Sequence, residues 1–200
     1  ETVKKQYGRQ DLALEIDTAF LIGEGHTKEG QFPFIDEFNM KTLKPKRLYQ
    51  STYKDKKESI FSIEDFKKGD VLVQIQSKSD YPNYFFRNIK KKNQLTQITD
   101  FKNPFESIKN VHKEVIKYKR KDGVELSGTL YLPAGYDTKK KEKLPLLIWA
   151  YPEEYKDKNS AGQSSQNPND FTFPYYGSFV YWVNKGYVVL DDASFPIMGE

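Results

Sequence analysis

The first 110 residues carry short apolar runs that are rich in β-branched and aromatic residues. Gly, Asn, Asp, Lys and Pro separate these runs at intervals of about 8–15 residues, a pattern typical of antiparallel strands. The expected strands are residues 19–22, 34–40, 59–63, 71–75 and 84–86. This part of the chain is therefore predicted to be all-β.

A weak internal repeat runs through the same region. The two ends of residues 38–50 resemble those of residues 87–99, with a turn between them in each copy. Leu48 and Ile98 occupy equivalent places and are 50 residues apart, near the roughly 40–50 residues of a four-stranded propeller blade. We expect residues 1–110 to form a partial β-propeller of about two blades. Two copies leave chance similarity open as an alternative.

After residue 110 the pattern changes, beginning with a β-hairpin. Residues 115–120 and 124–132 flank Asp122 and Gly123, a pair typical of a tight turn between two strands. In the second strand apolar residues occupy every second position from Val124. Pro133 is expected to end that strand, because proline has no N–H group to donate to a neighbouring strand.

Two apolar runs follow and predict parallel strands. Residues 144–150 and 187–190 are nearly continuous in apolar residues, as in parallel strands covered on both faces. Apolar residues at helical spacing in 179–183 predict a helix between them, and Gly186 is placed to cap its end. This order is that of the beginning of an α/β-hydrolase sheet. The expected fold is mixed: an all-β propeller-like segment, then the N-terminal part of an α/β-hydrolase domain at 111–200.

Residues 152–173 form the longest stretch without a periodic pattern, and they are rich in Asn, Ser, Gln and Gly. Long loops of this kind are commonly either functional or mobile. This one leaves the carboxyl end of a predicted parallel strand, where open α/β sheets bind their ligands. The position favours a functional loop, with a mobile decorative loop as the alternative.

The composition excludes several classes of protein. Apolar residues make up 37% of the chain and aromatic residues 15%, unlike collagen-like or disordered sequences. The longest apolar stretch, 144–151, has eight residues, whereas a membrane-spanning helix needs about 20. The charged residues at 1–5 do not resemble a signal peptide. Because the chain begins with Glu1 rather than Met, we expect it to be part of a longer protein.

The charged residues predict neither a nucleic-acid partner nor a metal site. Lys+Arg 32 and Asp+Glu 28 give a net charge of +4, and the lysines alternate with acids rather than forming patches with aromatic platforms. The lysine runs 90–92 and 139–141 lie in predicted turns, so a solvated surface is favoured over a polyanion site. The chain has no Cys and only His26 and His112. We expect no disulfide, metal or cofactor, and the cellular compartment stays open.

The sequence lacks the catalytic motif of an α/β-hydrolase. Such enzymes carry their nucleophile in G-x-S-x-G, followed along the chain by Asp or Glu and then His. Residues 161–165 lack the second Gly, and both histidines precede the predicted parallel strands. The acid pairs at 153–154 and 191–192 are expected to be structural or solvated, because neighbours on a strand point to opposite faces.

Several segments nevertheless resemble a known family. Residues 114–126 and 128–137 look like the beginning of the catalytic domain in the prolyl oligopeptidase family of serine peptidases. The segments similar to its glutamyl endopeptidase branch, known from bacteria and plant chloroplasts, are residues 144–152, 160–163 and 195–200. Those that resemble the propeller of this branch are residues 30–36 and 97–101.

The resemblance implies a longer enzyme in which a β-propeller covers an α/β-hydrolase domain and peptides are cleaved through an acyl-enzyme, with a preference for Glu. In this family a Tyr at the end of the first parallel strand donates to the oxyanion, and Tyr151 matches it. Pro152 follows where many relatives carry Gly. The Ser, Asp and His of the triad would lie beyond residues 1–200, so we expect this chain to be inactive alone. The expected partner of the longer enzyme is a peptide substrate.

Two other functions stay open. One is a non-catalytic, β-rich module that binds a peptide or a glycan through residues 152–173. The other is part of an esterase or of a different α/β-hydrolase, although few esterases have a propeller before the sheet. If the chain is instead part of the longer peptidase, its two parallel strands lack their later neighbours and have exposed edges, so we expect the chain to self-associate.

Overall fold

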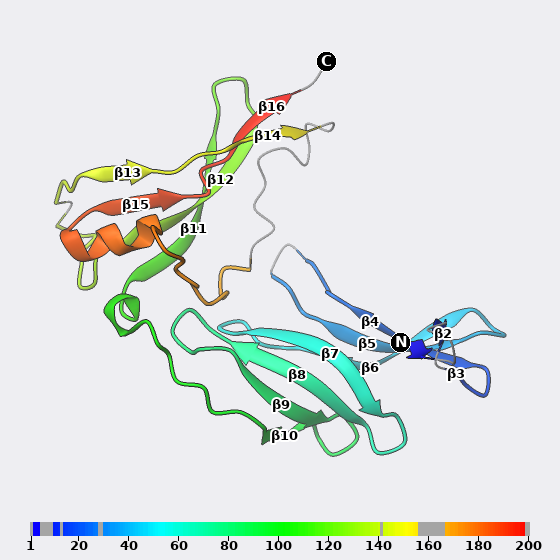
Figure 1. Cartoon of the computed structure of the whole chain (residues 1–200). Helices are drawn as coiled ribbons and strands as arrows, with labels where there is room; N and C mark the ends of the chain where they lie inside the picture. The colour runs from blue at the N-terminus through cyan, green and yellow to red at the C-terminus, as the bar shows by residue number, and fades with distance from the viewer. Residues whose placement is uncertain are drawn as a thin grey trace. The chain divides into compact units, whose positions relative to one another are not determined.

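The computed structural model describes residues 2–4, 10–12, 14–27, 30–140, 142–155 and 167–198. In this part of the chain strands predominate, and two short 3₁₀ helices accompany them (Figure 1). Contacts divide the chain into two compact units. The first contains Glu1–Lys102 and Asn169–Phe171, and the second contains Asn103–Pro168 and Thr172–Glu200. Within the described residues no helix has the length and apolar character needed to cross a membrane.

The first unit contains two four-stranded antiparallel sheets in which neighbouring strands follow one another along the chain. One sheet consists, in order, of β3 (Leu14–Glu15), β4 (Thr18–Gly23), β5 (Phe34–Asn39) and β6 (Lys44–Gln50). The other consists of β7 (Lys57–Asp65), β8 (Asp70–Gln76), β9 (Asn83–Asn88) and β10 (Gln94–Gln97). A separate pair joins β1 (Thr2–Lys4) to β2 (Gln10–Leu12). The five strands expected from the sequence are confirmed, apart from one residue at the end of β5.

The sequence repeat corresponds to a repeated hairpin turn, which joins β5 to β6 and β9 to β10. The Oδ1 atom of Asn39 accepts hydrogen bonds from the backbone N–H groups two and three residues later, both at 2.9 Å. Asn88, 49 residues further along, accepts the same two bonds at 3.1 and 2.8 Å. An Asn side chain that bonds to the following backbone is a common way to begin a turn. Both copies therefore start their turn by the same mechanism.

The two turns differ by one residue. Residues 40–43 separate the strands of the first hairpin, and residues 89–93 separate those of the second. The first turn contains one residue with positive φ, Leu43, whereas the second contains two, Lys92 and Asn93. The additional residue explains why equivalent positions are 49 residues apart before the turn and 50 residues apart after it.

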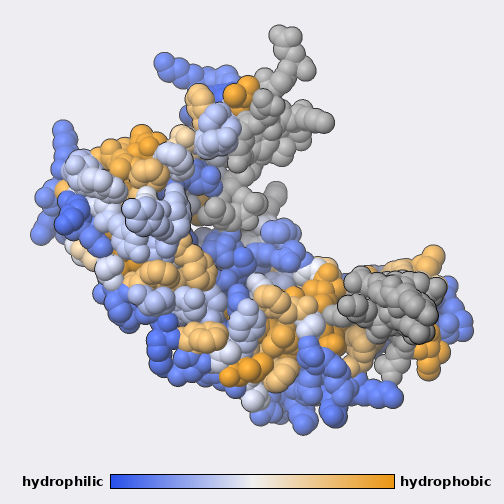
Figure 2. Space-filling model, viewed as in Figure 1, coloured by the Kyte–Doolittle hydropathy of each residue, from blue (hydrophilic) through white to orange (hydrophobic). Residues whose placement is uncertain are grey.

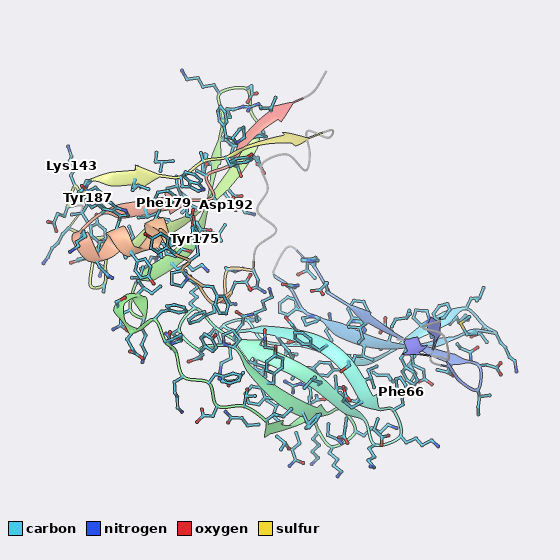
Figure 3. All side chains as sticks on the ribbon, viewed as in Figure 1. Phe66, Lys143, Tyr175, Phe179, Tyr187 and Asp192 are labelled. Atoms are coloured by element: carbon cyan, nitrogen blue, oxygen red, sulfur yellow. The ribbon has the colours of Figure 1, made fainter. Side chains whose placement is uncertain are left out.

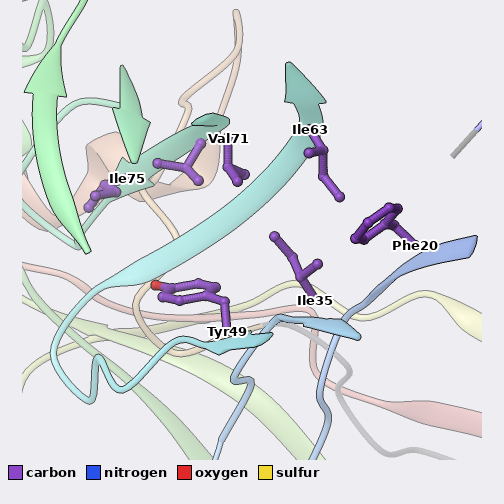
Figure 4. Close-up of a cluster of buried hydrophobic side chains, with 7 residues drawn as sticks. Phe20, Ile35, Tyr49, Ile63, Val71 and Ile75 are labelled. Carbon is purple, nitrogen blue, oxygen red and sulfur yellow. The ribbon is translucent and has the colours of Figure 1, made fainter. Parts of the chain in front are cut away.

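The core of the first unit lies between the two sheets. Phe20, Ile35 and Tyr49 from one sheet face apolar side chains of β7 and β8 from the other (Figure 4). On β8, Val71 and Val73 are completely buried. Each such side chain contributes about 1.5–3 kcal/mol when it is fully removed from water. The alternation of apolar residues along β8 therefore produces the face that holds the two sheets together.

A buried ion pair lies within this core. The side chains of Glu58 on β7 and Arg87 on β9 are 0% and 6% exposed, and the Nε atom of Arg87 donates to Glu58 Oε1 at 2.7 Å. The hydroxyl of Tyr49, on β6 of the other sheet, donates to Glu58 Oε2 at 2.6 Å. Arg87 also donates to the hydroxyl of Tyr53 at 3.3 Å and to the carbonyl oxygen of Asn93 at 3.0 Å. One carboxylate thus accepts hydrogen bonds from both sheets.

The protonation states follow from this arrangement. Burial raises the pKa of Tyr49 well above its usual value, and the nearby negative charge of Glu58 raises it further. Burial alone would lower the pKa of Arg87, but the charge of Glu58, together with smaller effects of Tyr49 and Tyr53, raises it overall. Tyr49 is therefore a neutral hydrogen-bond donor, and Arg87 is a permanent cation beside the carboxylate.

We expect Glu58→Gln to lower the free energy of unfolding of the first unit by about 3–5 kcal/mol, because it leaves the Arg87 guanidinium buried without a counter-charge. Urea denaturation followed by circular dichroism measures this change. Lys102→Met is the control, since Lys102 pairs with Asp100 at 2.7 Å on the surface and the two side chains are 82% and 68% exposed. Removing an exposed pair costs about 1 kcal/mol at most. Equal effects of the two substitutions would contradict the prediction.

The second unit is built on a four-stranded mixed sheet. In order across the sheet its strands are β11 (His112–Lys119), β12 (Glu125–Leu132), β15 (Val188–Asp191) and β13 (Leu146–Ile148). The expected hairpin of β11 and β12 is confirmed, with Gly123 at a φ of 86° in its turn. Beside it, hydrogen bonds from Arg120 lower the pKa of Asp122 to about 2. The expected parallel pairing of the two apolar strands is confirmed between β13 and β15.

The helix before β15 differs in kind from the usual crossover helix. It is the 3₁₀ helix η3 (Phe179–Lys185), and a second one, η2 (Glu106–Ile108), precedes β11. Gly186 caps η3 as expected: its φ is 82°, and its N–H donates to the carbonyl oxygen of Val183 at 3.1 Å. A left-handed backbone at this place suits glycine, which has no Cβ to clash.

The expectation that the first apolar run is covered on both faces is wrong for β13. Leu147, Val180 and Val189 lie in the core between the sheet and η3. Leu146 and Ile148 alternate with Leu147 on the strand, and they are 53% and 57% exposed. Figure 2 shows hydrophobic surface over this strand. The apolar run therefore has one covered face, and its other face is more than half exposed.

The expectation of an aperiodic stretch from 152 to 173 is wrong at its beginning. β14 (Pro152–Tyr155) pairs in parallel with β16 (Phe195–Met198), which comes after β15. The partner strand is distant in sequence, so the pairing left no local pattern to detect. Residues 156–166, which include the family-like segment 160–163, lie outside the described residues.

Candidate functional site at the carboxyl ends of the parallel strands

Tyr151 lies three residues after the end of the parallel strand β13 and directly before β14, whereas the sequence had placed it at the end of that strand and at the beginning of a long loop. It falls between Ile148, the last residue of β13, and Pro152, the first residue of β14. It is 70% exposed. Its phenol is therefore open to a molecule that approaches this end of the sheet.

The backbone that leads to Tyr151 is held by its neighbours. The N–H of Trp149 donates to the carbonyl oxygen of Leu190 at 2.8 Å, and the N–H of Ala193 donates to the carbonyl oxygen of Trp149 at 3.0 Å. These two bonds continue the contact between the chains of β13 and β15 beyond the strand itself. Two residues before Tyr151, both the N–H and the carbonyl oxygen of the main chain are thus bonded to the segment at the end of β15.

Aromatic contacts link η3 to the segments on either side of it. The ring of Phe179, at the beginning of the helix, stacks on Trp149 with 4.7 Å between the centroids and an interplanar angle of 30°. Trp182, in the middle of the helix, meets Tyr187, two residues after its end, edge to face with 5.2 Å between the centroids. Figure 3 labels Phe179 and Tyr187. Since Trp149 follows β13 directly, the stacking ties the beginning of η3 to the segment between β13 and Tyr151.

A close backbone contact fixes the chain after β15. A Cβ atom added to Gly128 would lie 3.0 Å from Leu190 Cδ1 and 3.3 Å from Ala193 Cα. The N–H of Ser194 donates to the carbonyl oxygen of Ser127 at 3.0 Å. Gly128 therefore allows the segment after β15 to pass close to β12, as glycine does where two backbones approach.

The two acids at the end of β15 have different surroundings. Asp191 is partly buried, and this burial raises the pKa of its carboxyl group although the charge of Lys113 acts in the opposite direction. Asp192 is exposed and has a φ of 50°. Its N–H donates to Asp191 Oδ1 at 3.0 Å. The two neighbouring acids thus differ in exposure.

A buried polar face lies behind these strand ends, and sequence reasoning missed it. Ser127, Thr129 and Tyr131 occupy alternate positions of β12 and are 2%, 3% and 6% exposed. Strand pairing places Thr129 opposite Asp191 and Tyr131 opposite Lys113. The sequence analysis had used only the apolar residues that alternate with these three, and these indicate the opposite face of β12. The same two-residue alternation, applied to Ser127, Thr129 and Tyr131, would have indicated that they share a face.

Tyr131 connects the polar face to the apolar core of the second unit. Burial raises the pKa of its hydroxyl, so the phenol stays neutral at ordinary pH. This hydroxyl lies 3.5 Å from the hydroxyl of Thr172. The Nζ atom of Lys113 lies 6.0 Å from the centre of the ring, at the outer limit of a cation–π contact.

The two histidines belong to other elements of the chain than the candidate site. His112 is exposed at the beginning of β11, as expected, with its Nε2 atom 3.6 Å from Glu114 Oε1. His26 forms an isolated bridge with Gln31 beyond β4, after Gly25 with its positive φ. Across the described residues no group of three His, Cys, Asp or Glu side chains is arranged to hold a metal ion.

Comparison of the sequence with known proteins finds no matching family model but finds curated relatives. The chain is 37% identical over 188 residues to a "Probable glutamyl endopeptidase, chloroplastic" of Oryza sativa subsp. japonica. It is 36% identical over 188 residues to the protein of the same name in Arabidopsis thaliana. The match covers 90% of this chain and 20% of each relative. The chain thus spans about one fifth of the length of these relatives.

Solved structures of peptidases share the fold. The isopeptidase AtxE2, in a variant with Astexin3-dC4 bound, aligns with 95% of this chain and 26% of its own at a TM-score of 0.52 and 15% identity. Oligopeptidase B from Trypanosoma brucei, with covalently bound antipain, aligns with 90% of this chain and 24% of its own, at a TM-score of 0.53 and 12% identity. Oligopeptidase B from Leishmania major aligns with 92% of this chain and 24% of its own, at a TM-score of 0.53 and 9% identity.

These likenesses to solved structures, at 9–15% identity, show the fold alone. The sequence relatives confirm the resemblance seen in the sequence: over 90% of its length the chain is similar to proteins named as glutamyl endopeptidases.

Asp191→Asn should flatten the pH dependence of stability. Burial raises the pKa of Asp191 in the folded chain above its ordinary value of 3.8, so the folded state binds the proton more tightly than the unfolded state. The contribution of this group to stability is therefore fully present below pH 3.8 and is lost as the pH rises through the folded pKa. Asn does not titrate and should remove this loss.

Urea denaturation from about pH 4 to pH 7 measures the effect through the free energy of unfolding. Asp191→Glu, which keeps a carboxyl group at this place, controls for the substitution itself. If Asp191→Asn loses as much stability as the unchanged chain between these pH values, the burial of Asp191 does not affect its titration.

Proposed function

We propose that this chain is part of a serine peptidase that cleaves peptides through an acyl-enzyme intermediate. The observation that carries the proposal is the 37% identity over 188 residues to a probable chloroplastic glutamyl endopeptidase. The shared fold with oligopeptidase B, which is known with covalently bound antipain, is consistent with it. The substrate class that follows is a peptide.

We further propose a role for each unit. Residues 1–110 would form part of a β-propeller, of which the two sheets are about two blades. The repeated turns at Asn39 and Asn88 support this, since blades of a propeller repeat a four-stranded meander. Residues 111–200 would begin an α/β-hydrolase domain. The parallel pair β13 and β15, with η3 between them in the chain, supports this second assignment.

The residue proposed to act in catalysis is Tyr151. A neutral phenol at the carboxyl end of a parallel strand can donate its O–H to the oxyanion that forms when a serine attacks a peptide carbonyl. The 70% exposure of Tyr151 and the fixed backbone at Trp149 support this role. Pro152 has no N–H, so the phenol, and not the next backbone amide, would be the donor here.

Cleavage after Glu is the specificity proposed for the longer enzyme. It rests on the name of the relatives and on the family resemblance. A pocket for a glutamate side chain needs a cation, and a guanidinium is well suited to bind a carboxylate through two hydrogen bonds. Within the described residues, no contact singles out one of the exposed lysines as that cation.

In the longer enzyme, Tyr151→Phe should lower kcat by about 10²–10³ with little change in KM, because the phenol would donate chiefly in the transition state. Steady-state kinetics with a glutamyl peptide substrate measure both constants. Tyr176→Phe is the matched control, since Tyr176 is fully exposed and also loses only a hydroxyl group. An unchanged kcat in Tyr151→Phe would reject the oxyanion role.

The purified 200-residue chain should not hydrolyse a glutamyl peptide above the rate of a buffer blank, because its sequence contains no G-x-S-x-G nucleophile motif. A discontinuous assay that separates the products detects slow cleavage. Hydrolysis that purifies together with the chain would show that its own residues are sufficient for catalysis.

A further inference from the structure

Three residues from the later part of the chain are integral to the first unit. Asn169, Asp170 and Phe171 group with the two sheets of residues 1–102 rather than with their neighbours in sequence. Each of the three is bound by a different group of the first unit, and these groups lie between residues 54 and 81. We call the groups on Lys54, Lys57, Gln76 and Tyr81 the clasp site.

Phe171 is the most deeply held of the three. It is 6% exposed, and its ring meets that of Tyr81 edge to face with the centroids 5.2 Å apart. Its backbone N–H donates to the Oε1 atom of Gln76 at 2.8 Å. Gln76 is itself 8% exposed at the end of β8. A buried amide oxygen that loses its donor costs free energy, so Gln76 favours an extended chain with an N–H at this place.

Tyr81 provides an aromatic surface that extends beyond Phe171. Its ring also meets that of Phe101 edge to face, with 6.4 Å between the centroids. Edge-to-face pairs of this kind add to the effect of burial. An aromatic side chain that enters the clasp site therefore contacts the ring of Tyr81, and Phe101 in turn supports the orientation of that ring.

The acidic residue has a cationic partner. The Nζ atom of Lys57, the first residue of β7, lies 2.7 Å from Asp170 Oδ1, and the two side chains are 22% and 26% exposed. The Nδ2 atom of Asn169 donates to the carbonyl oxygen of Lys54 at 2.9 Å. Because the ion pair is partly shielded from water, it is stronger than an exposed pair. The three contacts select for amide, acid and aromatic side chains in that order.

We propose that the clasp site is a peptide-binding site for an extended segment in which an acidic residue precedes an aromatic one, and that the chain fills it with its own Asn169–Phe171. The bound segment acts as an intramolecular ligand that can be released and replaced. A tethered ligand has an effective concentration of about millimolar, so it keeps a free peptide out unless its own contacts are weakened. This proposal does not depend on the peptidase function.

The test uses the 200-residue chain and a fluorescent peptide with the sequence of residues 167–173, Asn-Pro-Asn-Asp-Phe-Thr-Phe. Phe171→Ala removes the anchor of the tethered segment and empties the site. The peptide should bind this variant at least about tenfold more tightly than it binds the unchanged chain. Adding Lys57→Met to Phe171→Ala should weaken peptide binding by about tenfold. Adding Lys56→Met, a neighbouring lysine 4.0 Å from Asp80, should leave it unchanged.

Equal peptide binding to the unchanged chain and to Phe171→Ala, or an equal loss with Lys56→Met and Lys57→Met, would overturn the proposal. Hydrogen exchange of the full chain provides a second measurement that does not need the emptied variant. Asp170→Asn should speed exchange at the Phe171 amide about tenfold while the amides of β8 stay protected. Faster exchange throughout β7 and β8 would instead show that the three residues are a fixed part of the core, and would also overturn it.

Discussion

The structure of the first unit depends on one buried carboxylate. Glu58 has no exposure to water, and a charge in such a place is tolerated only when hydrogen bonds and an opposite charge replace its hydration. Arg87 supplies the charge from the same sheet, and Tyr49 supplies a hydroxyl from the other sheet. The two sheets must therefore approach each other at one register, and the apolar side chains around this network pack at the distance that it imposes.

A second ion pair between an arginine and an acid in this unit shows, by comparison, what burial changes. Arg47 donates to Asp36 across β5 and β6, and its guanidinium also lies 3.8 Å over the ring of Phe34. The side chain of Arg47 is 42% exposed, whereas that of Arg87 is 6% exposed. The pair at Arg47 joins neighbouring strands of one sheet and can exchange with water. The pair at Arg87 cannot, so it constrains the packing of the two sheets.

Local patterns in the sequence predicted the parts of the fold that depend on local physics. Asp122 and Gly123 indicated the hairpin because few other residues adopt its turn, and Gly186 indicated the end of η3 for the same reason. The network at Glu58 was not predictable, since its partners Tyr49 and Arg87 lie 9 and 29 residues away and no periodicity connects them. β14 escaped prediction because its partner strand begins at Phe195.

The candidate site shows the same limit. The sequence placed Tyr151 at the end of a parallel strand, and the structure has it exposed, three residues beyond β13 and directly before β14. The role of Tyr151 as a hydrogen-bond donor stays a prediction, because the oxyanion forms on a substrate when a serine of the longer enzyme attacks it. The polar face of β12 and the segment at Asn169–Phe171 were missed, since polar residues that become buried look like surface residues until the chain folds around them.

The central claim, that this chain is part of a serine peptidase, is tested most directly by reading the source gene beyond the codon for Glu200. The account predicts an in-frame continuation that contains G-x-S-x-G within some tens of residues, followed along the chain by an Asp and a His. A stop codon at that point, or a long continuation without this motif, would contradict it.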